Sequence, residues 1–492
     1  MHHSSRRRRP APLLAGAAAL LVACAPSREA ALEPVQASVL ARLGERPRAP
    51  DDSGADIDAE IERLLGKGLD VAGAVRLTLL NSPRLQALYE DVGIARAQVL
   101  QASLLENPVV RGQLLVPTRE SEGLEVALGL DVDVVSLLFA PLARTLAEAE
   151  LAASQVRVTG QILEATYRTR SLFYRYLAEA KRVELLRGFV EIAELSADVA
   201  RRLREAGNIT RLELLEEEAL FQRARLELIR AERRRAELRA QLNDEMGLTG
   251  ARTSWRVAAG LPPLPASDEV DLERLVPRAL DASLDLELAR RRLEAQERRL
   301  GLVEARRWVP GLAAGVEAER EEELWSVGPA LGVAVPVFDQ GQGGVALEEA
   351  RRRRLRYELR ALALRVRAEA QAVRARLTAA RASARHLEEV LVPLQREIVD
   401  EALLQYNAMT LGVFRLLDAR RRQLVVEQQR LDALLAYWLA RADYAQLASG
   451  RLPSPTGGEA LSVPDLDEER ERRLEPSTAP LAPEAGRQGE PG

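Results

Sequence analysis

The sequence predicts a mainly α-helical protein with a small β part, organised as two tandem repeats. Three observations lead to this fold class. Long stretches are rich in Ala, Leu, Arg and Glu, while aromatic residues make up only 4% of the 492 residues, which is typical of long helices packed side by side. Four short segments alternate apolar residues with small or polar ones, as strands do. The same order of segments occurs twice along the chain.

The N-terminus predicts export and a lipid anchor. Arginines at 6–9 precede a short apolar run over 13–22, which is the pattern of a secretory signal. The run ends in Leu-Val-Ala before Cys24, the only cysteine, and this ending resembles the lipobox of bacterial lipoproteins. The resemblance implies that residues 1–23 are removed and that Cys24 carries lipid. Ala25 follows, where inner-membrane lipoproteins carry Asp, so the outer membrane is the implied address. An ordinary signal peptide with a nearby cysteine is the alternative.

The repeat has an offset of about 202 residues. Leu214-Leu215-Glu216 corresponds to Leu416-Leu417-Asp418, and Asn107-Pro108 corresponds to Val309-Pro310. Each half reads helix, strand, turn, strand, very long helix, short turn and long helix, and a proline-rich linker separates the halves. The two flanking segments lack periodicity, so we expect both to be disordered or loosely laid on the surface.

These observations give the predicted boundaries. The parts are residues 24–60 for the N-terminal extension, 61–249 for repeat 1, 250–270 for the linker, 271–450 for repeat 2 and 451–492 for the tail. Repeat 1 is predicted to hold strands at 107–118 and 123–135 and long helices at 142–206 and 209–246. Repeat 2 is predicted to hold strands at 309–319 and 324–338 and long helices at 345–406 and 412–449.

The strand segments have the length and pattern of membrane-spanning strands. Each run is about 10 residues long, which is what a tilted strand needs to cross a bilayer. In the second strand the apolar residues share one face, and Glu125, Asp131 and Asp133 share the other. An open sheet edge cannot stand in lipid, so four strands per chain require several chains, and three would supply twelve. Two ordinary hairpins covering a soluble core are the alternative. Aromatic residues expected at the membrane boundaries are Trp308, Trp325, Phe139 and Phe338.

The long helices predict neighbours on two sides. A helix of about 60 residues would be on the order of 90–100 Å long. Apolar residues form two stripes on opposite flanks of the first long helix, which favours staves in a tube over a two-stranded coiled coil with one seam. A single-chain bundle with a broad apolar face is the alternative. The stripes are Val183, Leu186, Val190, Ala193, Ala197 and Ala200, and Leu185, Phe189, Ile192, Val199 and Leu203.

Over about residues 60–450 the chain resembles the TolC-type outer-membrane efflux family. The resemblance rests on the order of elements, the repeat, Asn107-Pro108 entering the first strand, and the sequence Val-Pro-Val-Phe-Asp over 335–339 closing the last. The segment Tyr-Asn-Ala-Met-Thr-Leu-Gly-Val-Phe-Arg-Leu-Leu-Asp-Ala over 406–419 supports it further.

The resemblance implies a homotrimer whose twelve strands form a membrane β-barrel continued by a periplasmic α-helical tunnel. The tunnel would dock to a periplasmic adaptor protein and an inner-membrane pump such as an RND-type transporter. It also implies that Asp418 constricts the closed periplasmic end and that Phe414 forms an apolar ring beside it. Arg415 stands where some members carry a second acidic residue. The turns at the tips would contact the adaptor through Gly207, Thr210, Thr410 and Gly412.

The predicted function is therefore a passive outer-membrane channel component of a tripartite efflux system, embedded in outer-membrane lipid. Rings of carboxylates in a pore attract cations, so Asp418 and lumen-facing Glu125, Asp131 and Asp133 predict cation preference. One alternative is a lipid-anchored periplasmic coiled-coil scaffold without a pore. Another is the same duct serving type I protein secretion. The sequence does not identify the substrate.

Other function classes are disfavoured. The histidines are His2, His3 and His386, which leaves no cluster for metal or triad chemistry, so we expect no enzyme and no cofactor. The glycine-rich segment 341–344 lacks the Lys-Ser/Thr of a phosphate loop. The 70 basic and 74 acidic residues alternate along the helices with a net charge of -4, which argues against nucleic acid as a partner.

Overall fold

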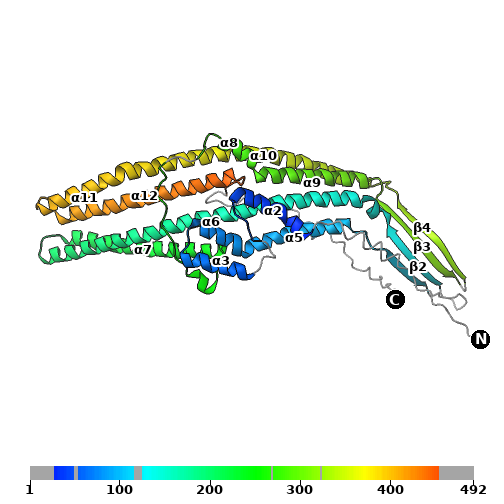
Figure 1. The fold of residues 1–492 in the computed structure, drawn as a ribbon, viewed down its shortest axis with the longest axis horizontal. Coiled ribbons are helices and arrows are strands. Elements are labelled where there is room, and N and C mark those ends of the chain that lie inside the picture. The colour runs from blue at the N-terminus through cyan, green and yellow to red at the C-terminus, as the bar shows by residue number, and fades with distance from the viewer. Residues whose placement is uncertain (1–26, 49–53, 116–124, 267–269, 322–323, 454–492) are drawn as a thin grey trace, which may run out of the picture. The chain divides into compact units, whose positions relative to one another are not determined.

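The computed structural model describes residues 27–48, 54–115, 125–266, 270–321 and 324–453. Long helices and one four-stranded sheet make up these residues, and the sheet lies at one end of the long helices (Figure 1). The predicted fold class, mainly helical with a small β part, is confirmed. Within the part that is described, no helix has both the length and the apolar character needed to cross a membrane.

The elements of the two halves follow the same order. The first half has α4 (Val71–Asn81), α5 (Pro83–Ser103), β1 (Val109–Leu115), β2 (Glu125–Asp133), α6 (Val134–Glu205) and α7 (Arg211–Glu245). The second half has α8 (Leu275–Ala282), α9 (Leu284–Arg306), β3 (Gly311–Glu321), β4 (Leu324–Ala334), α10 (Gln342–His386), a π-helical turn η3 (Leu387–Leu391), α11 (Val392–Asn407) and α12 (Val413–Ala448). A 3₁₀ turn, η2 (Gly250–Thr253), lies in the predicted linker.

The four strands form one antiparallel sheet in the order β1-β2-β3-β4. In the register Val110 pairs with Leu130, which pairs with Val316 on β3. Because paired residues of neighbouring strands share a face, this register gathers the large apolar side chains on one face of the sheet. The predicted alternation therefore extends across all four strands.

Helix α6 lies between α7 and α12. The first of its two predicted apolar stripes, which runs from Val183 to Ala200, is mostly buried, as the sequence predicts. Ala193, Ala197 and Ala200 are fully buried, and Val183 packs against Ala231 of α7. Further along, Phe173 and Tyr176 of α6 pack against Trp255 of the linker at ring-centroid distances of 6.0 and 5.0 Å. Each fully buried large apolar side chain contributes about 1.5–3 kcal/mol to the stability of the helical layer.

The transition from sheet to helix is sharper than the sequence predicts. Strand β2 ends at Asp133 rather than at 135, and α6 begins at Val134 rather than at 142. The reason is a helix cap, because the carboxylate of Asp133 accepts a hydrogen bond from the backbone N–H of Val135 at 2.8 Å. A carboxylate at that position also favours the positive end of the helix dipole.

The second half differs from its predicted boundaries at two places. Strand β4 ends at Ala334 instead of 338, since Pro336 has no N–H for a sheet ladder. The long helix predicted over 345–406 is divided by the π-helical turn Leu387–Leu391, immediately before Pro393. A proline inside a helix removes one backbone hydrogen bond and crowds the preceding turn, which accounts for the irregularity at that point.

The prediction of a loose N-terminal extension is wrong for two helices, α2 (Arg28–Leu43) and α3 (Gly54–Lys67). Helix α2 buries one stripe, Ala31, Val35 and Val39, against α5 and α6. The spacing of four residues puts these side chains on one helix face. Helix α3 buries Ile57 and Ile61. Residues 454–492 of the predicted tail lie outside the described residues.

Candidate functional site

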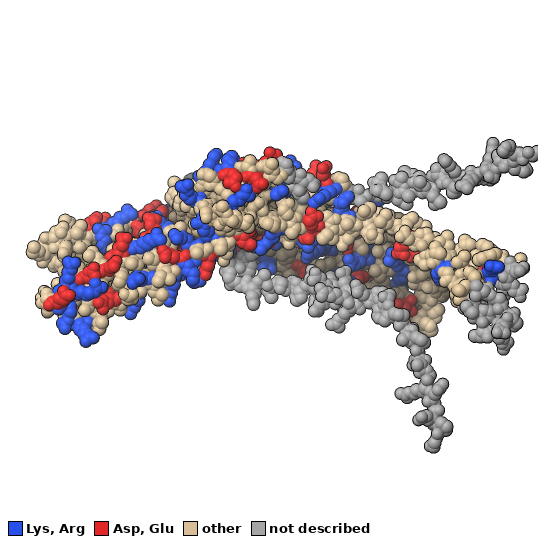
Figure 2. Space-filling model, turned by 90° about the horizontal axis from the view of Figure 1, so that it is seen from below, with Lys and Arg blue, Asp and Glu red and all other residues tan. Residues whose placement is uncertain are grey.

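One face of the sheet is a broad exposed apolar surface. Val110, Val327 and Leu331 are 75%, 68% and 72% exposed, although they are large apolar residues. Figure 2 shows charges of both signs mixed along the helices, whereas the strand end of the same view carries few. An apolar patch of this extent indicates a non-aqueous or protein partner. The other exposed members of this face are Leu114, Leu128, Leu130, Val132, Val316, Trp325 and Val333.

Three of the four expected boundary aromatics are exposed near strand ends. Trp308, Trp325 and Phe338 are 71%, 50% and 93% exposed. Phe139 is buried instead, and the guanidinium of Arg306 lies 5.9 Å from its ring centroid. That prediction is wrong for Phe139 because α6 already begins at Val134 and turns this side chain into the helical layer.

The opposite face of the sheet carries carboxylates among very small residues. Asp131 pairs with the guanidinium of Arg111 on β1, and Asp133 caps α6. Glu125 begins β2, and its side chain lies outside the described part of the structure. The two described carboxylates of the predicted set therefore lie on one face at the helix end of the sheet. One of them is charge-neutralised by an arginine that the prediction did not include.

The second repeat adds two carboxylates to this face that the sequence reasoning missed. Glu317 and Glu319 of β3 are exposed and pair in register with Gly129 and Ala127 of β2. Their period-two spacing from Gly315 could have identified them, because alternate residues of a strand share a face. The polar face is therefore acidic along more of its length than predicted.

Gly315 shows how closely the strands and Asp131 approach each other. A Cβ atom on Gly315 would lie 2.5 Å from the carbonyl oxygen of Leu130 and 2.7 Å from the carboxylate oxygen Oδ1 of Asp131. Only glycine fits at this position without a shift of the backbone. A hollow of about 820 Å³ opens nearby, and Asp131, Asp133 and Arg306 are among the residues that line it.

At the far end of the helices, Asp418 lies on α12 with its carboxylate 2.8 Å from the guanidinium of Arg422, one turn further on. Both side chains are partly exposed. A shallow groove of about 440 Å³ beside them is lined by Arg415 and by Glu397 and Glu401 of α11. Phe414 is half-buried one turn before Asp418. The constriction role of Asp418 and Phe414 stays a prediction, and the charge around Asp418 is mixed.

The two helical hairpins end in similar turns. Gly207 adopts a left-handed conformation with φ 74° and ends α6, and Thr210 caps α7 in a reciprocal capping box with Glu213. In the second hairpin the left-handed residue is Met409, with φ 58°, and its side chain is 94% exposed. Thr410 donates to the carbonyl oxygen of Gln405 from both its N–H and its hydroxyl, each at 3.0 Å.

Met409 was not among the predicted tip residues, although the repeat points to it. It stands about 202 residues after Gly207, at the equivalent place in the second hairpin. Gly412, which the sequence placed in the turn, has an ordinary φ of -71° and precedes α12. The exposed apolar side chain of Met409 is therefore accessible to a partner protein at the end of this hairpin.

A largely buried ion pair joins the two hairpins. The guanidinium of Arg421 on α12 lies 2.6 Å from the carboxylate of Glu217 on α7 and donates to the hydroxyl of Ser196 on α6 at 3.0 Å. Arg421 and Glu217 are each 17% exposed. Closer to the sheet, burial raises the pKa of the Asp443 carboxyl, while Arg376 opposes the shift.

Part of the chain matches a known protein family. The family described as Outer membrane efflux protein matches residues 137–248, which cover most of α6 and all of α7. This match covers less than a quarter of the 492 residues. Over 392 residues the chain is 25% identical to the cobalt-zinc-cadmium resistance protein CzcC of Cupriavidus metallidurans, covering 76% of this chain and 88% of the relative.

Solved structures show the same fold at lower identity. The outer membrane channel CmeC of Campylobacter jejuni superimposes with a TM-score of 0.63 at 12% identity, covering 84% of this chain and 91% of CmeC. The outer membrane protein VceC of Vibrio cholerae gives a TM-score of 0.61 at 15% identity, covering 80% and 97%. The predicted outer-membrane channel fold is thereby confirmed.

The match over residues 137–248 agrees with the predicted class of function, an outer-membrane efflux channel component rather than an enzyme.

Proposed function

We propose that three copies of this chain close side by side into one passive duct through the outer membrane. The observation that carries the proposal is the sheet, whose order β1-β2-β3-β4 leaves the outer edges of β1 and β4 without a partner strand among the described residues. Because the strands alternate in direction, β4 of one copy would meet β1 of the next in antiparallel fashion, and three copies would form a closed wall of twelve strands. A closed wall satisfies every backbone polar group in lipid.

The helical layer supports the same arrangement. Its outer helices are α7 on one side and α11 on the other, and both carry exposed apolar residues. A neighbour related by rotation would cover both the sheet edge and the helix edge on the same side, which is a head-to-tail interface that closes into a ring. These exposed residues are Leu212, Leu215, Leu226 and Ile229 on α7, and Leu394, Ile398, Leu403 and Leu404 on α11.

The hairpin tips would dock to a periplasmic adaptor, itself coupled to an inner-membrane pump such as an RND-type transporter. The tips lie at the end of the helices opposite the sheet (Figure 1). Gly207 and Thr210 in one tip, and Met409 and Thr410 in the other, form exposed turns of similar geometry. Two equivalent tips per chain would offer a ring of six docking points in a trimer.

We also propose that Cys24 carries lipid and anchors the protein to the outer membrane. Cys24 lies outside the described residues. Its support is the signal sequence and the small number of residues between it and α2, which packs on the half of the helical layer that adjoins the sheet.

Cation preference follows from the polar face of the sheet, if that face lines the duct. Asp131, Glu317 and Glu319 contribute carboxylates there, and among the described strand residues Arg111 contributes the one guanidinium on this face. Carboxylates lining a narrow water-filled passage attract cations and repel anions. Divalent metal cations fit this chemistry, and the name of the CzcC relative refers to cobalt, zinc and cadmium.

Reconstitution into planar bilayers tests the proposal. Lipidated protein extracted from outer membranes should give discrete conductance steps, with a reversal potential in a KCl gradient that shows cation preference. The double variant Glu317→Gln, Glu319→Gln should keep the conductance steps and lose a measurable part of the preference. The change Gln340→Glu, outside the strands, serves as the charge control. Absence of conductance would overturn the duct, and anion preference would overturn only the selectivity.

A further inference from the structure

Helix α2 lies in a groove between α5 and α6. Its buried face contacts α6 through the stripe that includes Leu151, Val158 and Ile162, and α5 through Tyr89 and Val92. The guanidinium of Arg28 lies 2.5 Å from the carboxylate of Glu90 on α5, and the side chain of Gln155 on α6 donates to the carbonyl oxygen of Ala31 at 2.8 Å. The helix is therefore fixed in the groove by packing and by polar contacts at its start.

The N-terminal end of α2 points toward the sheet. At its C-terminal end, Arg42 donates to the carbonyl oxygen of Ser449 at 2.5 Å, and Arg451 nearby pairs with Glu164 of α6 at 2.6 Å. Its start lies beside Gln155. Because α6 begins at the sheet, Gln155 lies closer to the sheet than Glu164 does, and the start of α2 is therefore the end nearer the sheet. Ser27, which caps α2, thus lies at the end of the groove nearer the sheet.

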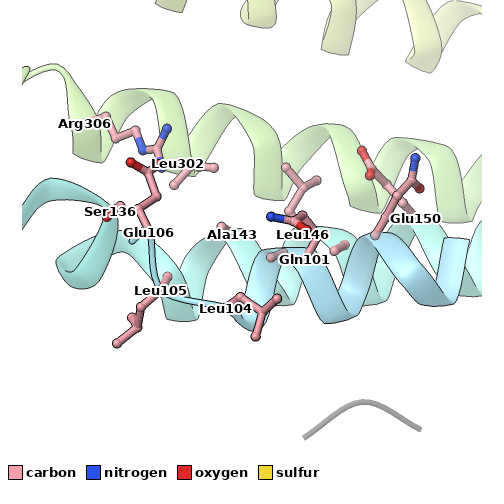
Figure 3. Close-up of a pocket in the computed structure, with 14 residues that line it drawn as sticks. Gln101, Leu104, Leu105, Glu106, Ser136, Ala143, Leu146, Glu150, Leu302 and Arg306 are labelled. Atoms are coloured by element: carbon pink, nitrogen blue, oxygen red, sulfur yellow. The ribbon is translucent and has the colours of Figure 1, made fainter. Parts of the chain in front are cut away.

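The groove continues beyond α2 as an unfilled hollow of about 490 Å³ (Figure 3). Ala140, Ala143 and Ala147 of α6 line it, and they continue the stripe that α2 covers further on, at helical spacing. The other large apolar residues of the lining are Leu104 and Leu105 from the segment after α5, Leu146 of α6 and Leu302 of α9. Polar groups at its rim are Gln98, Gln101, Glu106, Ser136, Glu150 and Arg306.

The length of the preceding chain matches the hollow. Ala31 lies four helical residues after Ser27, a rise of about 6 Å, and the three residues from Ser27 back to Cys24 span at most about 10 Å. Together these two segments reach about 16 Å from Ala31, which is hydrogen-bonded to Gln155 of α6. Along α6 this distance corresponds to about eleven residues counted from Gln155 toward the sheet. That reach ends at the level of Ala143, in the middle of the hollow. From there the hollow extends to Ser136, three residues after the end of β2.

We propose that this hollow receives residues 24–26 together with the acyl chains attached to Cys24. The inference rests on the proposed lipid anchor and adds where the lipid lies. The alanine stripe and the four leucines contact the methylene groups, which would otherwise meet water. Arg306 and Gln101 at the rim donate to the ester and amide oxygens of the lipid. The acyl chains then leave the hollow beside Ser136 and enter the bilayer where the sheet begins. The part of the lipid between Cys24 and the bilayer is therefore covered by the protein.

Photo-crosslinking tests the placement. The full-length protein carries a benzophenone amino acid at Ala143, is extracted from outer membranes and is irradiated, digested and analysed by mass spectrometry. The matched control is Leu142, which is 41% exposed on the same turn and does not line the hollow. We expect a crosslink between residue 143 and the acylated peptide that begins at Cys24, at least about five times stronger than from residue 142, because crosslinking reports local contact.

The other outcomes separate the inference from the anchor. The inference is overturned, and the anchor stays intact, if a lipid-bearing N-terminal peptide crosslinks equally from both positions. Capture of a phospholipid or of a second copy of the chain at residue 143 has the same meaning. An N-terminal peptide that carries no lipid overturns the anchor and the inference together. The mass of the N-terminal peptide, measured in the same digest, distinguishes these cases.

Hydrogen exchange gives a second readout that does not require a substitution in the hollow. The lipidated protein is compared with Cys24→Ala exported behind an ordinary cleavable signal. We expect amides over 136–147 to exchange several-fold faster without lipid, since the hollow then fills with water, whereas amides over 366–377 in α10 stay unchanged. Equal exchange over 136–147 in the two proteins, with lipid present in one, would contradict the placement.

Discussion

The ion pair between Arg421 and Glu217 holds the second hairpin onto the first near the tips. Its carboxylate accepts from the guanidinium of Arg421 at 2.6 Å and from the hydroxyl of Ser196, also at 2.6 Å. Ser196 is fully buried. The change Glu217→Gln keeps the size of the side chain and removes its charge, so Arg421 keeps its buried position without a counter-ion.

The size of the effect follows from burial and geometry. A hydrogen bond to a charged group contributes roughly 1.5–3 kcal/mol, and the loss of one partner of a fully buried ion pair costs more. Because both side chains keep some contact with solvent, we take about 2 kcal/mol for Glu217→Gln. At 1.4 kcal/mol per factor of ten, local detachment of α12 from α6 and α7 becomes about 30-fold more frequent.

Hydrogen exchange of α12 amides over 413–425 measures this detachment in the intact assembly. The control is Glu218→Gln, whose carboxylate pairs with Arg201 on the exposed surface and should change exchange less than about twofold. Arg421→Gln in the Glu217→Gln background should add little, because the two residues act as one pair. Equal exchange in Glu217→Gln and Glu218→Gln would refute the assignment of Arg421 and Glu217 as the link between the hairpins.

Three further predictions concern single residues. Burial raises the pKa of the Asp443 carboxyl, so the folded state binds its proton more tightly than the unfolded state does. The free energy of unfolding should therefore fall as pH rises from the unfolded pKa of about 3.9 through the raised pKa. Thermal melts recorded from pH 4 to 7 should show that Asp443→Asn lacks this pH-dependent loss of stability. Gly315→Val should prevent assembly in the outer membrane because its side chain would overlap β2, whereas Gly328→Val, in open space, should leave the yield of assembled protein unchanged on native gels. Met409→Gly should stabilise its left-handed turn by about 1 kcal/mol, and Gly207→Ala should destabilise the equivalent turn of the first hairpin by about 1 kcal/mol. We therefore expect the two substitutions to shift the urea midpoint in opposite directions. Shifts of the same sign would contradict this reasoning.

The sheet was largely predictable from the sequence, because a period of two is short enough to be read within each strand. The ends of the strands were not. Asp133 acts as a helix cap only in the context of a strand that runs directly into α6, and Pro336 ends β4 through a missing N–H rather than through any change in hydropathy. Alternation alone does not report either event.

The N-terminal helices were missed for a different reason. Pro34 lies inside α2, and the segment has few large apolar residues, so its composition predicts disorder. The helix is stable because Ala31, Val35 and Val39 fit a groove made by α5 and α6, which are distant in sequence. Tertiary packing overrides weak local propensity in such cases.

For the candidate site, residue types were predictable and their partners were not. Asp131 lies on the polar face of β2 and Asp418 on α12, and each has an arginine partner, Arg111 from a neighbouring strand and Arg422 one turn along the helix. Glu317, Glu319 and Met409 emerged only when the register of the sheet and the geometry of the tips were known. Sequence patterns identify a face, and the register decides which charges meet on it.

The central claim is that several chains share one closed wall of strands, and the mass of the assembly in detergent tests it most directly. Lipidated protein is extracted from outer membranes and measured by native mass spectrometry or by light scattering corrected for bound detergent. The account predicts a trimer, three times the mass of the mature chain, that resists dissociation on dilution. A monomer that is released without detergent would contradict both the shared wall and the lipid anchor.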